Sequence, residues 1–141
     1  MSKVPFQISQ VSVDQFATFP LPITESKQVN FDMNMSLSIN DEKRVVYCSF
    51  NVTMKLEGET IITILVTCGY SIESKSWEAF ASQSKTNNDV PIPFKFMKDI
   101  ADQTLATVRG VLYAKTENTK YSTFLIPIFD LKDLFKNLHS N

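Results

Sequence analysis

The sequence predicts an α+β fold in which four β-strands are followed by a long helix, an extended loop and a short terminal helix. Two observations support this prediction. Between residues 29 and 72, apolar and polar residues alternate in three successive runs, and a period of two is typical of strands with one buried face. From residue 94 onward the apolar residues recur at helical spacing instead.

Length and composition fit one globular domain that spans residues 1–141. The chain is long enough to bury a substantial core, and 43% hydrophobic with 21% charged residues is ordinary for a folded protein. A net charge of −1 is too balanced to predict binding to nucleic acid or to an anionic membrane. We expect strands over about 4–73, a loop over 74–90, and helices with a crossing loop over 91–139.

The sequence also bears on where the protein resides. It does not open with the basic and apolar segments of a secretory signal. Its longest apolar run falls far short of the roughly 20 residues that span a bilayer. We therefore expect a cytoplasmic protein that does not insert into membranes and keeps its two cysteines as reduced thiols.

The first strand is predicted around residues 6–16, where apolar residues alternate with polar ones. The parity of the apolar positions changes between Ile8 and Val11. A change of parity within one strand predicts a β-bulge, here near residues 9–10.

The next three strands are predicted to form an antiparallel meander. Their alternating runs lie at 29–39, 46–56 and 62–72, with turns at 40–43 and 57–59. The buried faces of two paired strands must lie on the same side of the sheet, which restricts the register. In the second hairpin this rule places Cys48 opposite Cys68, and in the first a turn centred on residues 41–42 places Leu37 opposite Val46. We interpret the two cysteines as core thiols rather than as a redox pair.

Residues 74–90 are largely polar and predict a mobile loop, in which Trp77 and Phe80 are exceptions. A long helix is then predicted over about 94–113. At 100° per residue its apolar residues form two stripes, which together are wider than the ~100° needed for docking on one sheet. The first stripe contains Phe94, Met97, Ala101, Leu105, Val108 and Leu112. The second contains Phe96, Ile100, Thr107 and Val111.

The second stripe predicts an oligomer interface, because something other than the helix's own sheet should cover it. The same helix from another subunit is the expected cover, which makes the protein an obligate homo-oligomer. After this helix an extended loop is predicted over 118–129, here called the crossing loop. Asp130 then suits the N-cap of a short terminal helix, whose apolar side holds Leu131, Leu134, Phe135 and Leu138.

Motifs for enzyme chemistry are missing from the sequence. It has no phosphate-binding glycine loop, no nucleophile elbow and no Cys-x-x-Cys. Its one histidine, His139, lies near the end of the chain without a positioned partner, and one histidine with two strand cysteines is too few ligands for zinc. We therefore expect neither an enzyme nor a bound metal or cofactor.

Large apolar side chains in the predicted loops are the candidate binding residues. Exposed apolar surface more often marks a binding site, although a small core beneath a loop is an equally good interpretation. These residues are Trp77, Phe80, Tyr121, Phe124, Ile126 and Phe129.

The order of elements and two short segments resemble the SecB-like protein-export chaperones. The segments are Arg109-Gly110 near the end of the long helix, and Leu125-Ile126-Pro127 with Asp130-Leu131 in the tail. The likeness covers nearly the whole chain. It implies a four-stranded antiparallel sheet of Greek-key type, with the first strand beside the fourth, a long and a short helix on one face, and assembly as a dimer of dimers.

The resemblance also implies a function. SecB-like proteins hold non-native polypeptides in apolar grooves without ATP, and the loop between their helices lines part of the groove. The implied partners are unfolded polypeptides, with the translocase motor or an antitoxin as further partners. An alternative is a specialised adaptor or structural oligomer of the same fold that binds one partner.

Overall fold

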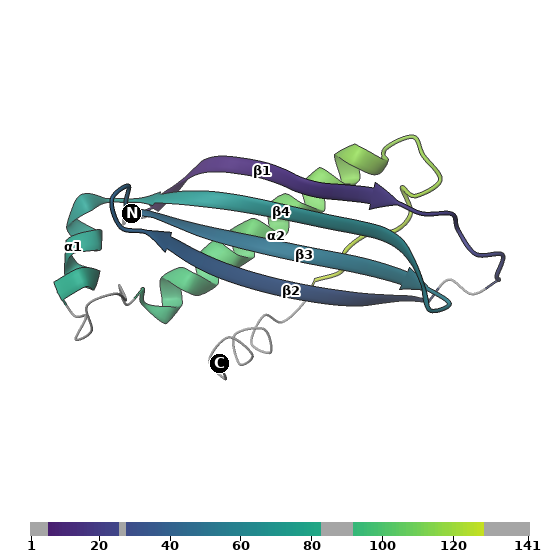
Figure 1. The fold of residues 1–141 in the computed structure, drawn as a ribbon, viewed down its shortest axis with the longest axis horizontal. Coiled ribbons are helices and arrows are strands. Elements are labelled where there is room, and N and C mark those ends of the chain that lie inside the picture. The colour runs from purple at the N-terminus through teal and green to yellow at the C-terminus, as the bar shows by residue number, and fades with distance from the viewer. Residues whose placement is uncertain (1–5, 26–27, 83–91, 129–141) are drawn as a thin grey trace.

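The α+β architecture predicted from the sequence is present in the computed structural model, which describes residues 6–25, 28–82 and 92–128. Within these described residues, four antiparallel strands form one sheet, and two helices accompany it (Figure 1). The elements are β1 (Phe6–Thr18), β2 (Val29–Asn40), β3 (Val45–Leu56), β4 (Glu59–Ile72), α1 (Ser74–Ser82) and α2 (Phe94–Thr116).

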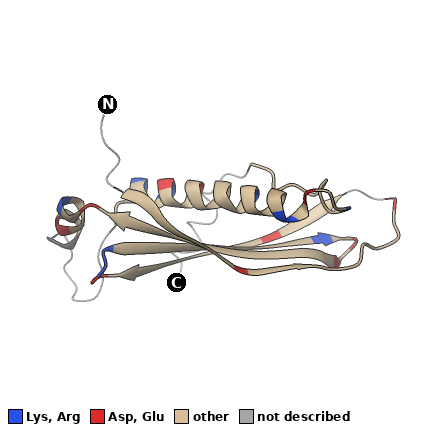
Figure 2. Cartoon of the chain, turned by 90° about the horizontal axis from the view of Figure 1, so that it is seen from above, with Lys and Arg blue, Asp and Glu red and all other residues tan. Residues whose placement is uncertain are grey.

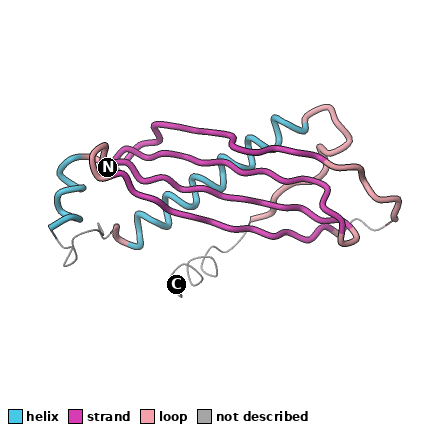
Figure 3. The backbone as a smooth tube through the Cα atoms, viewed as in Figure 1, coloured by secondary structure: helices cyan, strands magenta, loops and turns pink. Residues whose placement is uncertain are grey.

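The strand order is β1-β4-β3-β2, so the first strand lies beside the fourth, as expected. Strands β2, β3 and β4 form a meander. The last of these strands pairs on its other side with β1, the first strand of the chain, which is the Greek-key arrangement. The long connection between β1 and β2 therefore crosses one end of the sheet. This connection and the crossing loop lie at the same end of the molecule, where both leave the ends of long elements (Figure 3).

The predicted register of the second hairpin is confirmed at its centre, where Cys48 pairs with Cys68. The turn itself is shorter than predicted, because Leu56 pairs with Glu59 and only two residues remain in the loop. Those two residues, Glu57 and Gly58, have φ angles of 53° and 78°. Positive φ at both central positions is what a type I′ hairpin turn requires. A register shift after Met54 accommodates the shorter loop.

The predicted register of the first hairpin is wrong by two residues, since Leu37 pairs with Cys48 rather than with Val46. The parity is unchanged, so the same side chains face the core. The loop holds four residues and ends at Arg44, which adopts a φ of 54°. Its backbone is tied by the Asn40 side chain, whose Oδ1 accepts a hydrogen bond from the Lys43 amide at 3.1 Å.

Strand β1 carries the predicted bulge between Ile8 and Gln10 and a second, unpredicted one between Val13 and Gln15, where the parity of the apolar positions changes again from Val13 to Phe16. The second bulge contains Asp14. Its carboxylate accepts hydrogen bonds from the hydroxyls of Ser12 at 2.7 Å and Thr67 at 2.5 Å. These bonds lie on the outer, polar face of the sheet and lower the pKa of the Asp14 carboxyl below its usual range.

Helix α2 lies along one face of the sheet, as seen from above (Figure 2). Alternate side chains of β3 and β4 point toward it and are fully buried, among them Phe50 and Val66. The helix contributes five apolar residues to the same core, which are Ile100, Ala101, Leu105, Val108 and Leu112. Two polar side chains in this layer are satisfied, because Tyr70 Oη lies 2.7 Å from Thr104 Oγ1 and the Thr104 hydroxyl donates to the Ile100 carbonyl at 2.8 Å.

The predicted loop over 74–90 is wrong for residues 74–82, which form α1 at the end of the sheet away from the crossing loop (Figure 1). Trp77 and Phe80 are three residues apart, so a helix places both on one side, and both are buried. The ring of Phe80 packs against Phe96 with a centroid separation of 5.4 Å. Core packing thus favours helix here over the polar composition of the segment. The predicted terminal helix from Asp130 lies outside the described residues.

Candidate functional site

A groove with a volume of about 620 Å³ lies between the crossing loop, the β1–β2 connection and the adjoining end of the sheet. The floor comes from the start of β2 and the end of β3, with Val29, Phe31 and Leu56. One wall is the β1–β2 connection, with Leu21, Pro22 and Thr24. The other wall is the crossing loop, with Lys120, Thr123, Phe124, Leu125 and Pro127.

Hydrogen bonds hold the crossing loop in place at two points. Near its start, Tyr121 is buried and its hydroxyl donates to the Phe19 carbonyl at 2.6 Å. This bond joins the two walls of the groove, because Phe19 opens the β1–β2 connection. Farther along, the Arg109 guanidinium of α2 donates from Nε to the Ile126 carbonyl at 3.1 Å and from Nη2 to the Pro127 carbonyl at 2.7 Å.

The lining of the groove is suited to binding rather than to chemical transformation. Most of its side chains are apolar, and its polar members are hydroxyls and one ammonium group. Within residues 6–25, 28–82 and 92–128, no group of three or more His, Cys, Asp or Glu side chains could hold a metal ion. An apolar, well-anchored concavity can bury apolar side chains of another molecule.

The candidate binding residues are distributed differently from the sequence prediction. Phe124 is half-buried and lines the groove. Tyr121 and Ile126 are buried, so they position the loop instead of facing the groove. Trp77 and Phe80 belong to the core beneath α1 and are not among the groove residues, because the segment that carries them is helical. Phe129 lies outside the described residues.

Several groove residues were missed by the sequence reasoning. The sequence analysis predicts no binding role for the β1–β2 connection, yet this segment supplies Leu21 and Pro22. The usable signal was its composition, since Phe19-Pro20-Leu21-Pro22 is apolar while lacking any strand or helix period. An apolar segment without periodicity at a chain connection indicates a wall or a cover.

The exposed stripe of α2 is narrower than predicted. Ile100 is fully buried against the sheet, so its assignment to an intersubunit surface is wrong. Phe96, Thr107 and Val111 keep partial exposure, as predicted for that stripe. Phe94 at 50% and Tyr113 at 57% exposure lie on other sides of the helix, more than 100° around its axis from the centre of this stripe.

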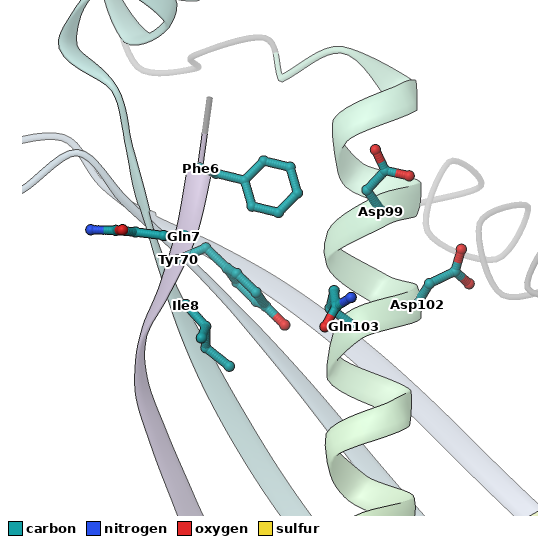
Figure 4. Close-up of a pocket in the computed structure, with 7 residues that line it drawn as sticks. All are labelled: Phe6, Gln7, Ile8, Tyr70, Asp99, Asp102 and Gln103. Atoms are coloured by element: carbon teal, nitrogen blue, oxygen red, sulfur yellow. The ribbon is translucent and has the colours of Figure 1, made fainter. Parts of the chain in front are cut away.

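A second, smaller groove of about 510 Å³ lies between the start of β1 and α2 (Figure 4). Its floor is aromatic, with Phe6 edge-on to Tyr70 at a centroid separation of 5.9 Å. Gln103 extends toward Tyr70, whereas Asp102 points away from it (Figure 4). Asp99 also lines this groove, so its charged side chains are acidic, whereas the first groove carries the basic Lys120.

The two cysteines are free thiols that face each other under α2, as predicted. Burial raises the pKa of the Cys48 thiol to about 11, opposed by a hydrogen bond with Thr104, and burial also raises the pKa of Cys68. Since the thiolate is the reactive form, neither group serves as a nucleophile near neutral pH.

Comparisons with known proteins bear on the fold. No protein-family model matches the sequence, and no curated protein matches it. Among solved structures, the Mycobacterium tuberculosis SecB-like chaperone Rv1957, in complex with a ChAD peptide from the HigA1 antitoxin Rv1956, matches with a TM-score of 0.53 at 10% identity. The match covers 89% of this chain and 91% of that one. The chain has a SecB-like fold.

A second solved structure gives a similar match. It is a protein of unknown function from Streptococcus agalactiae, at 12% identity with a TM-score of 0.49, covering 92% of this chain and all of that one.

In the parts of the chain that the structure describes, no helix combines the length and the apolar character that crossing a membrane requires.

Proposed function

We propose that this protein is a molecular chaperone of the SecB-like type, which holds non-native polypeptides in its apolar groove without ATP. The observation that supports the proposal is the apolar groove beside the crossing loop, on a fold that resembles a SecB-like chaperone. Unfolded chains share exposed apolar side chains rather than a sequence. A surface that binds them therefore needs broad apolar contact and few directional groups, and this groove has both properties.

Phe124 is the residue proposed to contribute most to client binding. Its ring is half-buried in the free protein, so a client can still cover the remaining part. Aromatic side chains bury a large area with few rotamers to restrict. Covering about half of the ring contributes about 1 kcal/mol, which corresponds to about a fivefold change in Kd.

A second candidate function is that of an adaptor for one dedicated partner. The observation that favours it is that the structural relative Rv1957 was solved with a peptide from an antitoxin. A groove of about 620 Å³ is large enough for a few side chains of a single segment. A general holdase and an adaptor would use the same groove and differ in the range of ligands that they accept.

We also propose that the protein acts in the cytoplasm as a homo-oligomer, with the partly exposed side of α2 in the contact. The supporting observation is the row of partly exposed residues formed by Phe96, Thr107 and Val111. Light scattering at micromolar concentration tests the assembly, and a monomer at that concentration would contradict it. Export and docking on a translocase motor remain part of the chaperone proposal, to be tested by binding the purified motor.

The test of the groove compares Phe124→Ala with Phe94→Ala. Both variants truncate a phenylalanine, but Phe94 is half-exposed at the first position of α2 and is not among the groove residues. Each is assayed for suppressing aggregation of several unrelated denatured proteins and for the affinity of a labelled apolar peptide. The proposal expects weaker binding by Phe124→Ala alone, with the thermal transition unchanged within a few degrees.

The outcomes separate the candidate functions. Suppression of several unrelated clients supports a holdase, and binding confined to one segment supports an adaptor. If Phe124→Ala stays folded and both activities match those of the wild type, the groove is not the binding site.

A further inference from the structure

Charge is distributed unevenly in the groove defined above. Lys120 is the one charged side chain among the described residues that line it. The remaining lining is apolar except for the hydroxyls of Thr24 and Thr123. Because Lys120 is exposed, its ammonium group contributes a positive potential that water and salt partly screen.

The position of this ammonium group is restricted. Lys120 Nζ lies 5.6 Å from the centroid of the Tyr121 ring, within the range of a cation–π contact. The Tyr121 ring is in turn held by its buried position and by its hydrogen bond to the Phe19 carbonyl. The ammonium therefore stays at the edge of the groove, beside the bond that joins the two walls.

The described carboxylates do not neutralise Lys120. The one ion pair within residues 6–25, 28–82 and 92–128 joins Lys55 to Asp32. Two acidic residues adjoin lining residues without lining the groove themselves, Glu25 beside Thr24 and Glu57 beside Leu56. The Glu57 carboxylate accepts a hydrogen bond from the Thr24 hydroxyl at 3.2 Å, and neither carboxylate forms an ion pair with Lys120. The charge of Lys120 thus remains available to a ligand.

We infer that Lys120 gives the groove a preference for an extended apolar segment that carries an acidic side chain. This inference rests on the proposed function and specifies the class of ligand at the same site. A segment whose apolar side chains occupy the floor would place a flanking Asp or Glu near the ammonium. A flanking Lys or Arg at that position would instead meet a like charge at close range.

The experiment uses three labelled peptides with one apolar sequence and a single flanking position occupied by Glu, Gln or Lys. Binding to the full chain is measured by fluorescence anisotropy. The wild type is expected to bind the Glu peptide about two- to fivefold more tightly than the Gln peptide, the range of an exposed ion pair, with the Lys peptide weakest. The difference should shrink between 0.05 M and about 0.5 M salt, because salt screens exposed charges.

Two substitutions test whether Lys120 causes the preference for the Glu peptide. Lys120→Glu should reverse the order of the Glu and Lys peptides. The matched control is Lys115→Glu, which makes the same change of charge at an exposed position in the last turn of α2, outside the groove lining. This control should keep the wild-type order.

Each outcome decides between the two claims. If no peptide binds the wild type, both the groove function and the inference fail. If the peptides bind equally, or if Lys120→Glu keeps the wild-type order, the inference fails while the groove function stands. If Lys115→Glu reverses the order as Lys120→Glu does, the preference belongs to the overall charge of the chain, and the assignment to Lys120 is wrong.

Discussion

Tyr121→Phe removes one oxygen atom and with it the bond that joins the two walls of the groove. The hydroxyl donates to the Phe19 carbonyl over 2.6 Å, and the ring around it is 8% exposed. Because the ring itself is retained, packing is conserved and the change reports on the hydrogen bond.

The loss in the free energy of unfolding depends on whether the Phe19 carbonyl finds another hydrogen-bond donor. A neutral hydrogen bond contributes about 0.5–1.5 kcal/mol net, and a buried acceptor left without a partner costs more. Phe19 is 40% exposed, so water can reach this part of the connection and replace the lost donor. We therefore expect a loss of about 1 kcal/mol in the free energy of unfolding, which lowers Tm by about 3–4 °C in a chain of this length.

The binding assay separates this effect from simple destabilisation. With the walls no longer joined, the labelled apolar peptide should dissociate several-fold faster while its association rate changes little, since interface changes act mostly on dissociation. Stopped-flow anisotropy at 15 °C, where the variant is still fully folded, measures both rates. A normal dissociation rate together with the expected drop in Tm would refute the role of Tyr121 in setting the groove, and an unchanged Tm would refute the bond itself.

Three further predictions follow from contacts described above. Arg109→Met removes both donors to the carbonyls at 126 and 127 and should cost about 1–2 kcal/mol of stability by urea denaturation, with Arg109→Lys intermediate. The raised pKa of Cys48 keeps the native thiol protonated, so its contribution to stability is full below about pH 9 and is lost as pH rises toward about 11. Cys48→Val should therefore flatten the plot of unfolding free energy against pH between about pH 9 and 11. The lowered pKa of Asp14 acts in the opposite direction, with stabilisation present above the ordinary carboxyl pKa and lost on acidification, so Asp14→Asn should be less stable at pH 7 and should converge with the wild type in acid urea melts.

The strands were predictable because burial imposes a strict rule on them. One buried face forces a period of two, and parity then allows few registers, which is why Cys48 was correctly paired with Cys68. Parity does not distinguish registers that differ by two residues. The error at Leu37 arose there, because the length of the loop before Val45 depends on the unusual backbone of Arg44.

The helix α1 and the groove were harder to predict, for a common reason. Trp77 and Phe80 are apolar residues within a polar segment, and only packing across the fold, such as that of Phe80 on the Phe96 ring, shows that they belong to the core. The groove likewise depends on contacts between distant segments. Tyr121 and Phe19 are 102 positions apart, and no local pattern shows that they share a hydrogen bond. Phe124 lines the groove, but the same signal, an aromatic ring in a predicted loop, also selected Trp77, Phe80 and Tyr121, which are buried. The signal therefore does not by itself separate groove residues from core residues.

The strand order has a consequence for how this chain is made. Among the strands that the structure describes, β1 pairs with β4 alone, so Phe6 has no strand partner until Ile72 has been synthesised. During synthesis β1 emerges first and remains without its partner until the last strand has left the ribosome, a delay of several seconds at about 5–20 residues per second. Throughout that interval Ile8, Val11 and Val13 have no sheet to join, and they stay 40–49% exposed even after folding. Until β4 is complete, the nascent chain therefore exposes apolar strand residues of the kind that favour aggregation.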